Sequence, residues 1–73
     1  MTQLEIYKDN EISASAVRTD SGEWKPQVTV TDMRLNMKVT VPNISETFPT
    51  REEAEKEGLF FGKNWIDQGK PAP

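Results

Sequence analysis

The sequence contains neither cysteine nor histidine among its 73 residues. Without cysteine the chain has no disulfide framework and no thiolate metal site. Without histidine it lacks the commonest general base and the commonest metal ligand at neutral pH. We therefore expect no catalytic, metal-binding or cofactor-binding residue, and hence no enzyme. The fold should be stabilised by its apolar core, or by that core together with a partner subunit.

A basic surplus and long apolar runs are missing as well. Nine basic and twelve acidic side chains give a formal net charge of −3, whereas proteins that bind duplex nucleic acid usually carry a basic surplus. No apolar run approaches the roughly 20 residues of a membrane-spanning helix. The first residues lack the basic and apolar regions of a signal peptide. We expect a cytoplasmic protein that does not bind membranes and whose partner is a protein, or a second copy of itself, rather than a nucleic acid.

The first half of the chain alternates between apolar and polar residues. Ile12, Ala14 and Ala16 fall on one side of a strand, and Val28 and Val30 fall on one side of another. This period of two is typical of half-buried strands joined by short turns into an antiparallel meander. The expected strands cover residues 4–7, 11–18, 24–32 and 35–41, with Leu35, Met37, Val39 and Val41 facing the core in the last.

The second half predicts one helix from about residue 51 to about residue 68. Thr50 and Glu53 form a capping box at its start, and Gly69 stops it. The buried stripe should comprise Ala54, Gly58, Phe61, Gly62 and Trp65, with both glycines facing Ala14 and Ala16. The acidic residues near the helix start are explained by capping and solvation; they are Glu52, Glu53, Glu55 and Glu57.

Together these elements predict an α+β fold. A three- or four-stranded antiparallel β-meander carries one C-terminal α-helix packed on one face. Residues 1–69 form the single domain and residues 70–73 a flexible tail. Nothing in the sequence remains to cover the second face of the sheet.

Two surfaces are candidate interaction sites. The uncovered sheet face carries short polar side chains and a weakly basic rim, suited to a peptide or to single-stranded nucleic acid; its candidate residues are Ser13, Ser15, Thr29, Thr31, Lys38 and Arg18. The second candidate is Phe60, a bulky aromatic between Lys56 and Lys63 on the outer face of the helix. Each surface also has an explanation without a function: the sheet face can simply be solvated, and Phe60 can be a single exposed apolar residue. We expect Asp67 to pair with Lys63 or Lys70.

The motifs Phe48-Pro49-Thr50-Arg51-Glu52-Glu53-Ala54 and Trp65-Ile66-Asp67 resemble those of a small uncharacterised bacterial protein family. In that family a strand meander precedes an F-x-T-x-E-E-A helix that ends in W-I-D. The resemblance spans nearly the whole chain and implies the fold, but no activity. A looser similarity, resting on Thr50 to Ala54 and the order of strands, links the chain to HicB-type antitoxin domains.

The function itself is unknown from sequence. The favoured hypothesis is a small non-catalytic protein-interaction module that binds another protein or a second copy of itself. It would use an edge strand or the Phe60 side of the helix. The alternative is a single-stranded nucleic-acid-binding domain that uses the polar sheet face.

Overall fold

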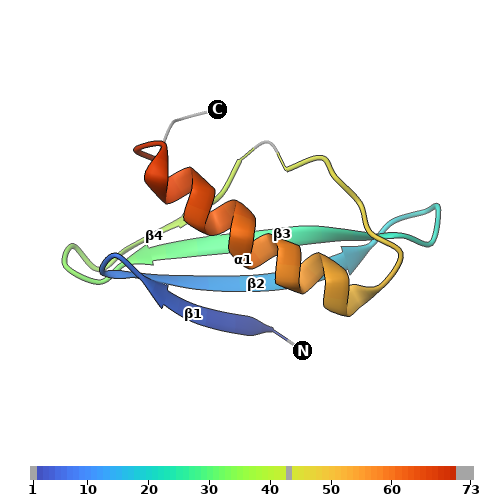
Figure 1. Ribbon diagram of the computed structural model, residues 1–73, viewed down its shortest axis with the longest axis horizontal. Helices are drawn as coiled ribbons and strands as arrows, with labels where there is room; N and C mark the ends of the chain where they lie inside the picture. Colours follow the sequence, from blue (N-terminus) through green and yellow to red (C-terminus); the bar gives the residue numbers. More distant parts are fainter. Residues whose placement is uncertain (1, 43, 71–73) are drawn as a thin grey trace.

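The computed structural model describes residues 2–42 and 44–70. Four strands form one antiparallel sheet in the order β1-β2-β3-β4, and one helix packs on it (Figure 1). The α+β fold expected from the sequence is confirmed, with four strands. The elements are β1 (Gln3–Tyr7), β2 (Asn10–Arg18), β3 (Trp24–Asp32), β4 (Met37–Thr40) and α1 (Arg51–Asp67).

The two central strands form the floor of the core. Ile12 pairs with Val30 and Ala14 pairs with Val28, and because paired residues share a face, all four side chains point toward α1. Each of these four side chains is buried. The period-two pattern of the sequence therefore identified the buried face of both strands.

Two glycines let α1 lie directly on that floor. A Cβ added to Gly58 would come within 3.0 Å of Ala14 Cβ, and one added to Gly62 within 2.7 Å of Ile12 Cγ2. Real Cβ atoms essentially never approach another atom as closely as the second distance. Gly58 thus faces Ala14 as expected. Gly62 faces Ile12 and Val28 rather than Ala16, because the helix axis crosses the strands at an angle (Figure 1).

Both ends of α1 are set by local chemistry. The Thr50 hydroxyl accepts a hydrogen bond from the Glu53 backbone N–H at 3.1 Å, which satisfies one of the unpaired donors of the first turn. After Gln68, which caps the C-terminal end, Gly69 adopts a φ of +88°. That left-handed conformation ends helices at little cost only for glycine.

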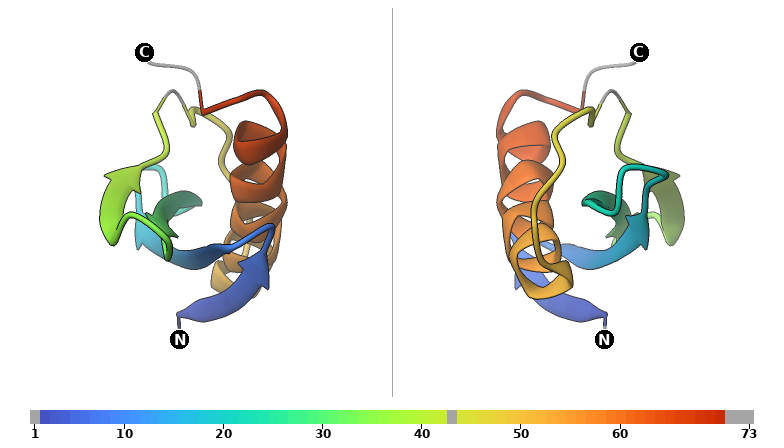
Figure 2. Two further views of the ribbon diagram at one scale, coloured as in Figure 1. Left: turned by 90° about the vertical axis from the view of Figure 1, so that its left-hand side faces the viewer. Right: turned by 90° about the vertical axis from the view of Figure 1, so that its right-hand side faces the viewer.

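The helix covers only part of the sheet. It packs against β1, β2 and β3, and within the described residues it does not reach β4. Figure 2 shows β4 as the strand farthest from α1. A helix is about 10 Å wide and strands lie about 4.8 Å apart, so one helix covers two to three strands. Met37 and Val39, expected in the core, are therefore exposed.

The segment between β4 and α1 is held at both ends. Val41 is buried, and farther along, Phe48 forms an isolated bridge with Trp24, each accepting the other's N–H at 2.8 Å. The Phe48 ring lies 6.4 Å from that of Phe61. The described residues of this segment therefore follow the N-terminal half of β3 and leave the free edge of β4 uncovered.

Lys70, expected as the first residue of the tail, contacts the sheet. The Lys70 ammonium donates to Asn10 Oδ1 at 2.8 Å and to Asp32 Oδ2 at 3.3 Å, so Lys70 is tied to the sheet. The rest of the expected tail, 71–73, lies outside the described residues.

The close contact at Gly62 yields a stability prediction. Gly62→Val should lower the free energy of unfolding by about 1–3 kcal/mol more than Asn64→Val, because the added methyl groups overpack against Ile12. Asn64→Val is the matched control, since it places the same β-branched residue on the exposed side of the same helix. Chemical denaturation measures both, and equal losses would show that α1 does not lie this close to β2.

Candidate functional site

The outer edge of β4 carries backbone groups that have no neighbouring strand in the part of the chain that the structure describes. β4 ends the sheet, and the Val41 N–H donates to Val28 O at 2.8 Å across the β3 side. The backbone N–H and C=O groups of successive residues point to opposite sides of an antiparallel strand. Those of Met37 and Val39 therefore point toward β3, as the Val41 N–H does. The N–H and C=O groups of Lys38 and Thr40 therefore point outward, where another strand can pair with them.

An apolar groove of about 190 Å³ adjoins this edge on the helix side of the sheet. Its apolar lining comes from β3, β4, the turn between them and the end of α1: Val30, Leu35, Met37, Val39 and Trp65. Three of these residues are exposed: Leu35 is 66% exposed, Met37 58% and Val39 43%. Such contiguous exposed apolar surface is typical of a binding site rather than of a solvated strand.

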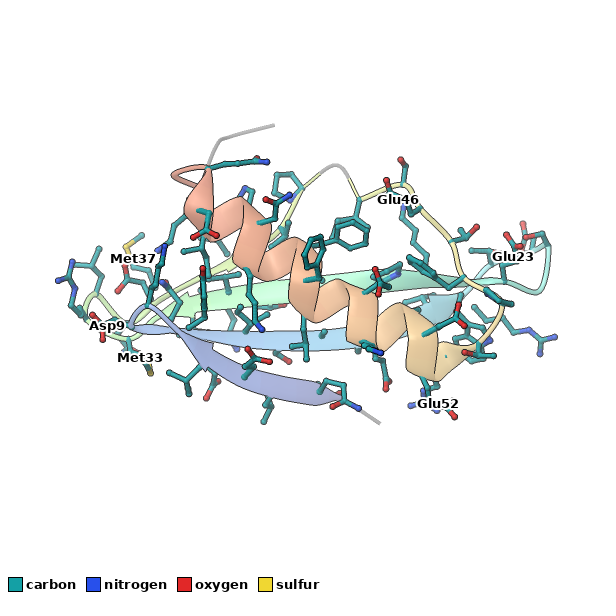
Figure 3. The ribbon with its side chains drawn as sticks, in the orientation of Figure 1. Asp9, Glu23, Met33, Met37, Glu46 and Glu52 are labelled. Atoms are coloured by element: carbon teal, nitrogen blue, oxygen red, sulfur yellow. The ribbon has the colours of Figure 1, made fainter. Side chains whose placement is uncertain are left out.

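Polar contacts close one end of the groove. Asp32 and Lys70 line it, and Lys70 bridges Asp32 to the buried Asn10. Hydrogen bonds from the backbone N–H of Leu35, from Lys70 and from the backbone N–H of Arg34 hold the pKa of Asp32 below its usual value. The groove thus has a fixed ion pair beside its apolar floor. Figure 3 shows Met33 and Met37 near this end of the sheet.

Phe60 lies on the outer face of α1, as the sequence predicted, with 61% of its side chain exposed. A groove of about 450 Å³ runs beside it, lined by Glu5, Lys56, Glu57, Leu59 and Lys63. Lys63 forms an ion pair with Glu5 on β1, so two of the charged side chains of this groove are already paired across the helix–sheet boundary. Phe60 also packs edge-on against Phe61, at 6.5 Å between ring centroids.

The open face of the sheet gathers most of the polar residues that the sequence singled out. Ser13 pairs with Thr29, and Thr31 pairs with Lys38, so these side chains share the face opposite α1; Ser15 shares it too. Arg18 does not: it pairs with Trp24 on the helix side. The face also holds two exposed apolar residues of β1, Leu4 and Ile6, opposite Ser13 and Glu11.

No aromatic side chain of the four strands belongs to the open face. Tyr7 pairs with Asn10 and Trp24 with Arg18, which places both rings on the helix side. Tyr7 Oη donates to both carboxylate oxygens of Asp67 at 3.0 Å. Trp24 lies under the Arg51 guanidinium at 5.9 Å. The stacking surface of a single-strand binder is therefore not assembled on these strands.

Asp67 has a different partner from the one expected. Its Oδ1 accepts from the Lys8 ammonium at 2.7 Å, whereas Lys63 pairs with Glu5 and Lys70 with Asp32. The hydrogen bonds from Lys8 and then from Tyr7 hold the pKa of Asp67 below its usual value. Sequence spacing along the helix could not reveal a partner in the β1–β2 turn.

Glu55 corrects a second expectation. Glu55 was expected to be solvated, but it is buried, with 1% of its surface exposed. Its carboxylate accepts a hydrogen bond from Arg51 Nε at 3.3 Å, one helical turn earlier. Glu52 and Glu53 at the helix start are exposed. A buried carboxylate one position from Ala54 breaks the apolar stripe, so periodicity alone could not find it.

The β4 groove was also missed. The alternation of Leu35, Met37, Val39 and Val41 predicts a core strand, but of these four residues only Val41 is buried. The pattern correctly gave the face of these side chains, but it carried no information on where the helix stops covering the sheet.

Two absences concern the described part of the chain. Among residues 2–42 and 44–70, no group of three or more carboxylates is placed to hold a metal ion. Within the same residues no helix is long and apolar enough to cross a membrane.

These features define a small α+β domain with an uncovered edge strand and an apolar groove beside it. The chain belongs to a family of domains of unknown function, DUF6566, which matches residues 1–73. This agrees with the resemblance to a small uncharacterised family, while the similarity to HicB-type antitoxins is not shown. No curated protein and no solved structure matches the chain.

The Asp67 contacts predict acid sensitivity. The pKa of Asp67 is lower in the folded state than in the unfolded state. The stability that Asp67 contributes is therefore fully present above the pKa of the unfolded state, about 4, and is lost as the pH falls through the pKa of the folded state. The melting temperature should therefore fall below about pH 4, and Asp67→Asn should reduce that fall.

Thermal melts between neutral and strongly acidic pH measure the effect. Asp20→Asn is the control, since it removes a carboxylate from the β2–β3 turn, far along the chain from Lys8. Parallel melting curves for Asp67→Asn and the unmodified protein would contradict a contribution from this contact.

Proposed function

We propose that this domain is a cytoplasmic, non-catalytic protein-interaction module that binds through β4. The observation that carries the proposal is the pairing of two features at one place. The outward backbone groups of Lys38 and Thr40 lie beside an apolar groove lined by Met37, Val39 and Leu35. An added strand gains main-chain hydrogen bonds from the edge and specificity from side-chain pockets beside it.

Among the surfaces of the described residues, the β4 edge is favoured because a mainly apolar groove lies directly beside its outward backbone groups. β1 is the second edge, but on its helix side Glu5 and Tyr7 already bind Lys63 and Asp67. The groove beside Phe60 is lined mainly by charged side chains. The strand edge beside this groove is that of β1. We therefore place binding at β4 rather than at Phe60.

Single-stranded nucleic-acid binding on the open face is the second candidate. Lys25 and Lys38 border that face among the hydroxyl groups of β2 and β3. Stacking of bases on aromatic side chains normally provides much of the affinity of such binders. On this face Leu4 and Ile6 occupy exposed positions where aromatics would be needed, so the protein-interaction role is better supported.

A displayed library of random linear peptides tests the proposed function. Enriched peptides should carry apolar residues at alternate positions, because every second side chain of an added strand faces the groove. Binding to Val39→Lys should fall by about tenfold or more, since the ammonium would be placed against an apolar strand. Gln27→Lys places the same charge on the open face and should leave binding unchanged.

Two outcomes contradict the proposal. Peptides that bind Val39→Lys as well as the unmodified protein would place the binding surface elsewhere. Oligonucleotide binding that Gln27→Lys strengthens, with no peptide enriched, would favour the nucleic-acid role instead.

A further inference from the structure

We infer that the strand added to β4 is the β4 of a second copy of this chain, paired antiparallel with Val39 on the two-fold axis. The inference rests on the proposed function and specifies the partner. An isologous dimer requires an edge that is complementary to itself. Whether the β4 edge is complementary to itself depends on the register in which the two strands pair.

Three registers centre the two-fold axis on the part of β4 whose backbone groups point outward. Directly opposed residues in an antiparallel pair lie on the same face, so the two-fold axis must pass through a residue and not between two. The outward backbone groups belong to Lys38 and Thr40. The axis can therefore lie at Lys38, at Val39 or at Thr40.

Two of the three registers carry a defect. An axis at Lys38 places the two ammonium groups directly opposite each other, and opposed like charges destabilise a strand pair. An axis at Thr40 pairs Lys38 with Pro42 of the second copy, and proline has no N–H to donate. Each defect follows from one residue at or beside β4.

An axis at Val39 avoids both defects. Lys38 of each copy then exchanges two hydrogen bonds with Thr40 of the other, which uses all the outward groups of both residues. Val39 opposes Val39 in a non-hydrogen-bonded pair, where side chains approach most closely. Both valines lie on the helix side of the sheet, so their 43% exposed side chains cover each other at the boundary of the two grooves.

The dimer would form one eight-stranded sheet with a helix from each copy on the same side. The two β4 grooves would then face each other across the axis, which joins two small apolar surfaces into one. The contact area of a single four-residue strand pair is below the roughly 1,200–2,000 Å² of stable interfaces. The dimer is therefore concentration-dependent, and dilution should dissociate it.

Cysteine cross-linking tests the register directly, because the chain has no cysteine of its own. Opposed residues of a non-hydrogen-bonded pair lie about 4.5 Å apart at Cα, within the range that a disulfide bridges. Val39→Cys should form a covalent dimer under mild oxidation about tenfold faster than Lys38→Cys, whose thiol opposes Thr40 of the other copy. Phe60→Cys measures the rate of collisional cross-linking at an exposed site.

The outcomes separate this inference from the proposed function. Fast cross-linking of Val39→Cys alone, with a mass by sedimentation that rises with concentration toward twice the monomer, supports the dimer. Equal rates for all three variants, or fastest cross-linking of Lys38→Cys or Phe60→Cys, overturn it. If the protein stays monomeric while peptides still bind in a Val39-dependent manner, the second copy is wrong and the interaction module stands. If neither occurs, both are wrong.

Discussion

The close seating of α1 on β2 and β3 is the contact on which the rest of the structure depends. Gly58 and Gly62 bring the helix backbone against Ala14, Ile12 and Val28, with no room for a Cβ at Gly62. Interiors are packed as densely as organic crystals, so this contact fixes the position of the helix across the sheet. A domain of this length has little other core on which to depend.

That position has a consequence at each edge of the sheet. Toward β1, the helix is tied by polar contacts, with Lys63 paired to Glu5 and Asp67 held by Tyr7 and Lys8. Toward β4 there is no helix to bury the apolar side chains of the strand within the part of the chain that the structure describes. The same close packing that stabilises the centre therefore leaves an apolar strand uncovered at one side. We connect the proposed function to this uncovered strand.

The features predicted correctly from the sequence are local ones. The capping hydroxyl of Thr50, the end of the helix before Gly69 and the buried faces of β2 and β3 each depend on residues a few positions apart. The features that were missed depend on distant ones. Asp67 finds its cation in the turn after β1, and the exposure of Met37 and Val39 depends on where the helix crosses the sheet.

The candidate site shows the same division. The alternation of residues 35–41 correctly placed Met37 and Val39 on one face and Lys38 on the other. It could not show that this face is open to solvent, nor which backbone groups point away from β3. Those groups follow from the strand order and from the Val41 hydrogen bond to Val28, which are properties of the folded sheet. The position of Arg18 on the helix side, by contrast, agrees with the alternation of Ile12, Ala14 and Ala16, so its assignment to the open face was wrong.

Amide hydrogen exchange along β4 tests most directly whether its outer edge is the docking surface. In dilute solution the Met37 and Val39 amides, which point toward β3, should exchange slowly, and the Lys38 and Thr40 amides should exchange rapidly. As the protein concentration rises, the Lys38 and Thr40 amides should become protected while the amides of β2 remain unchanged. Lys38 and Thr40 amides that are protected at every dilution would contradict an open outer edge, and amides that stay unprotected at every concentration would contradict the docking of a second copy there.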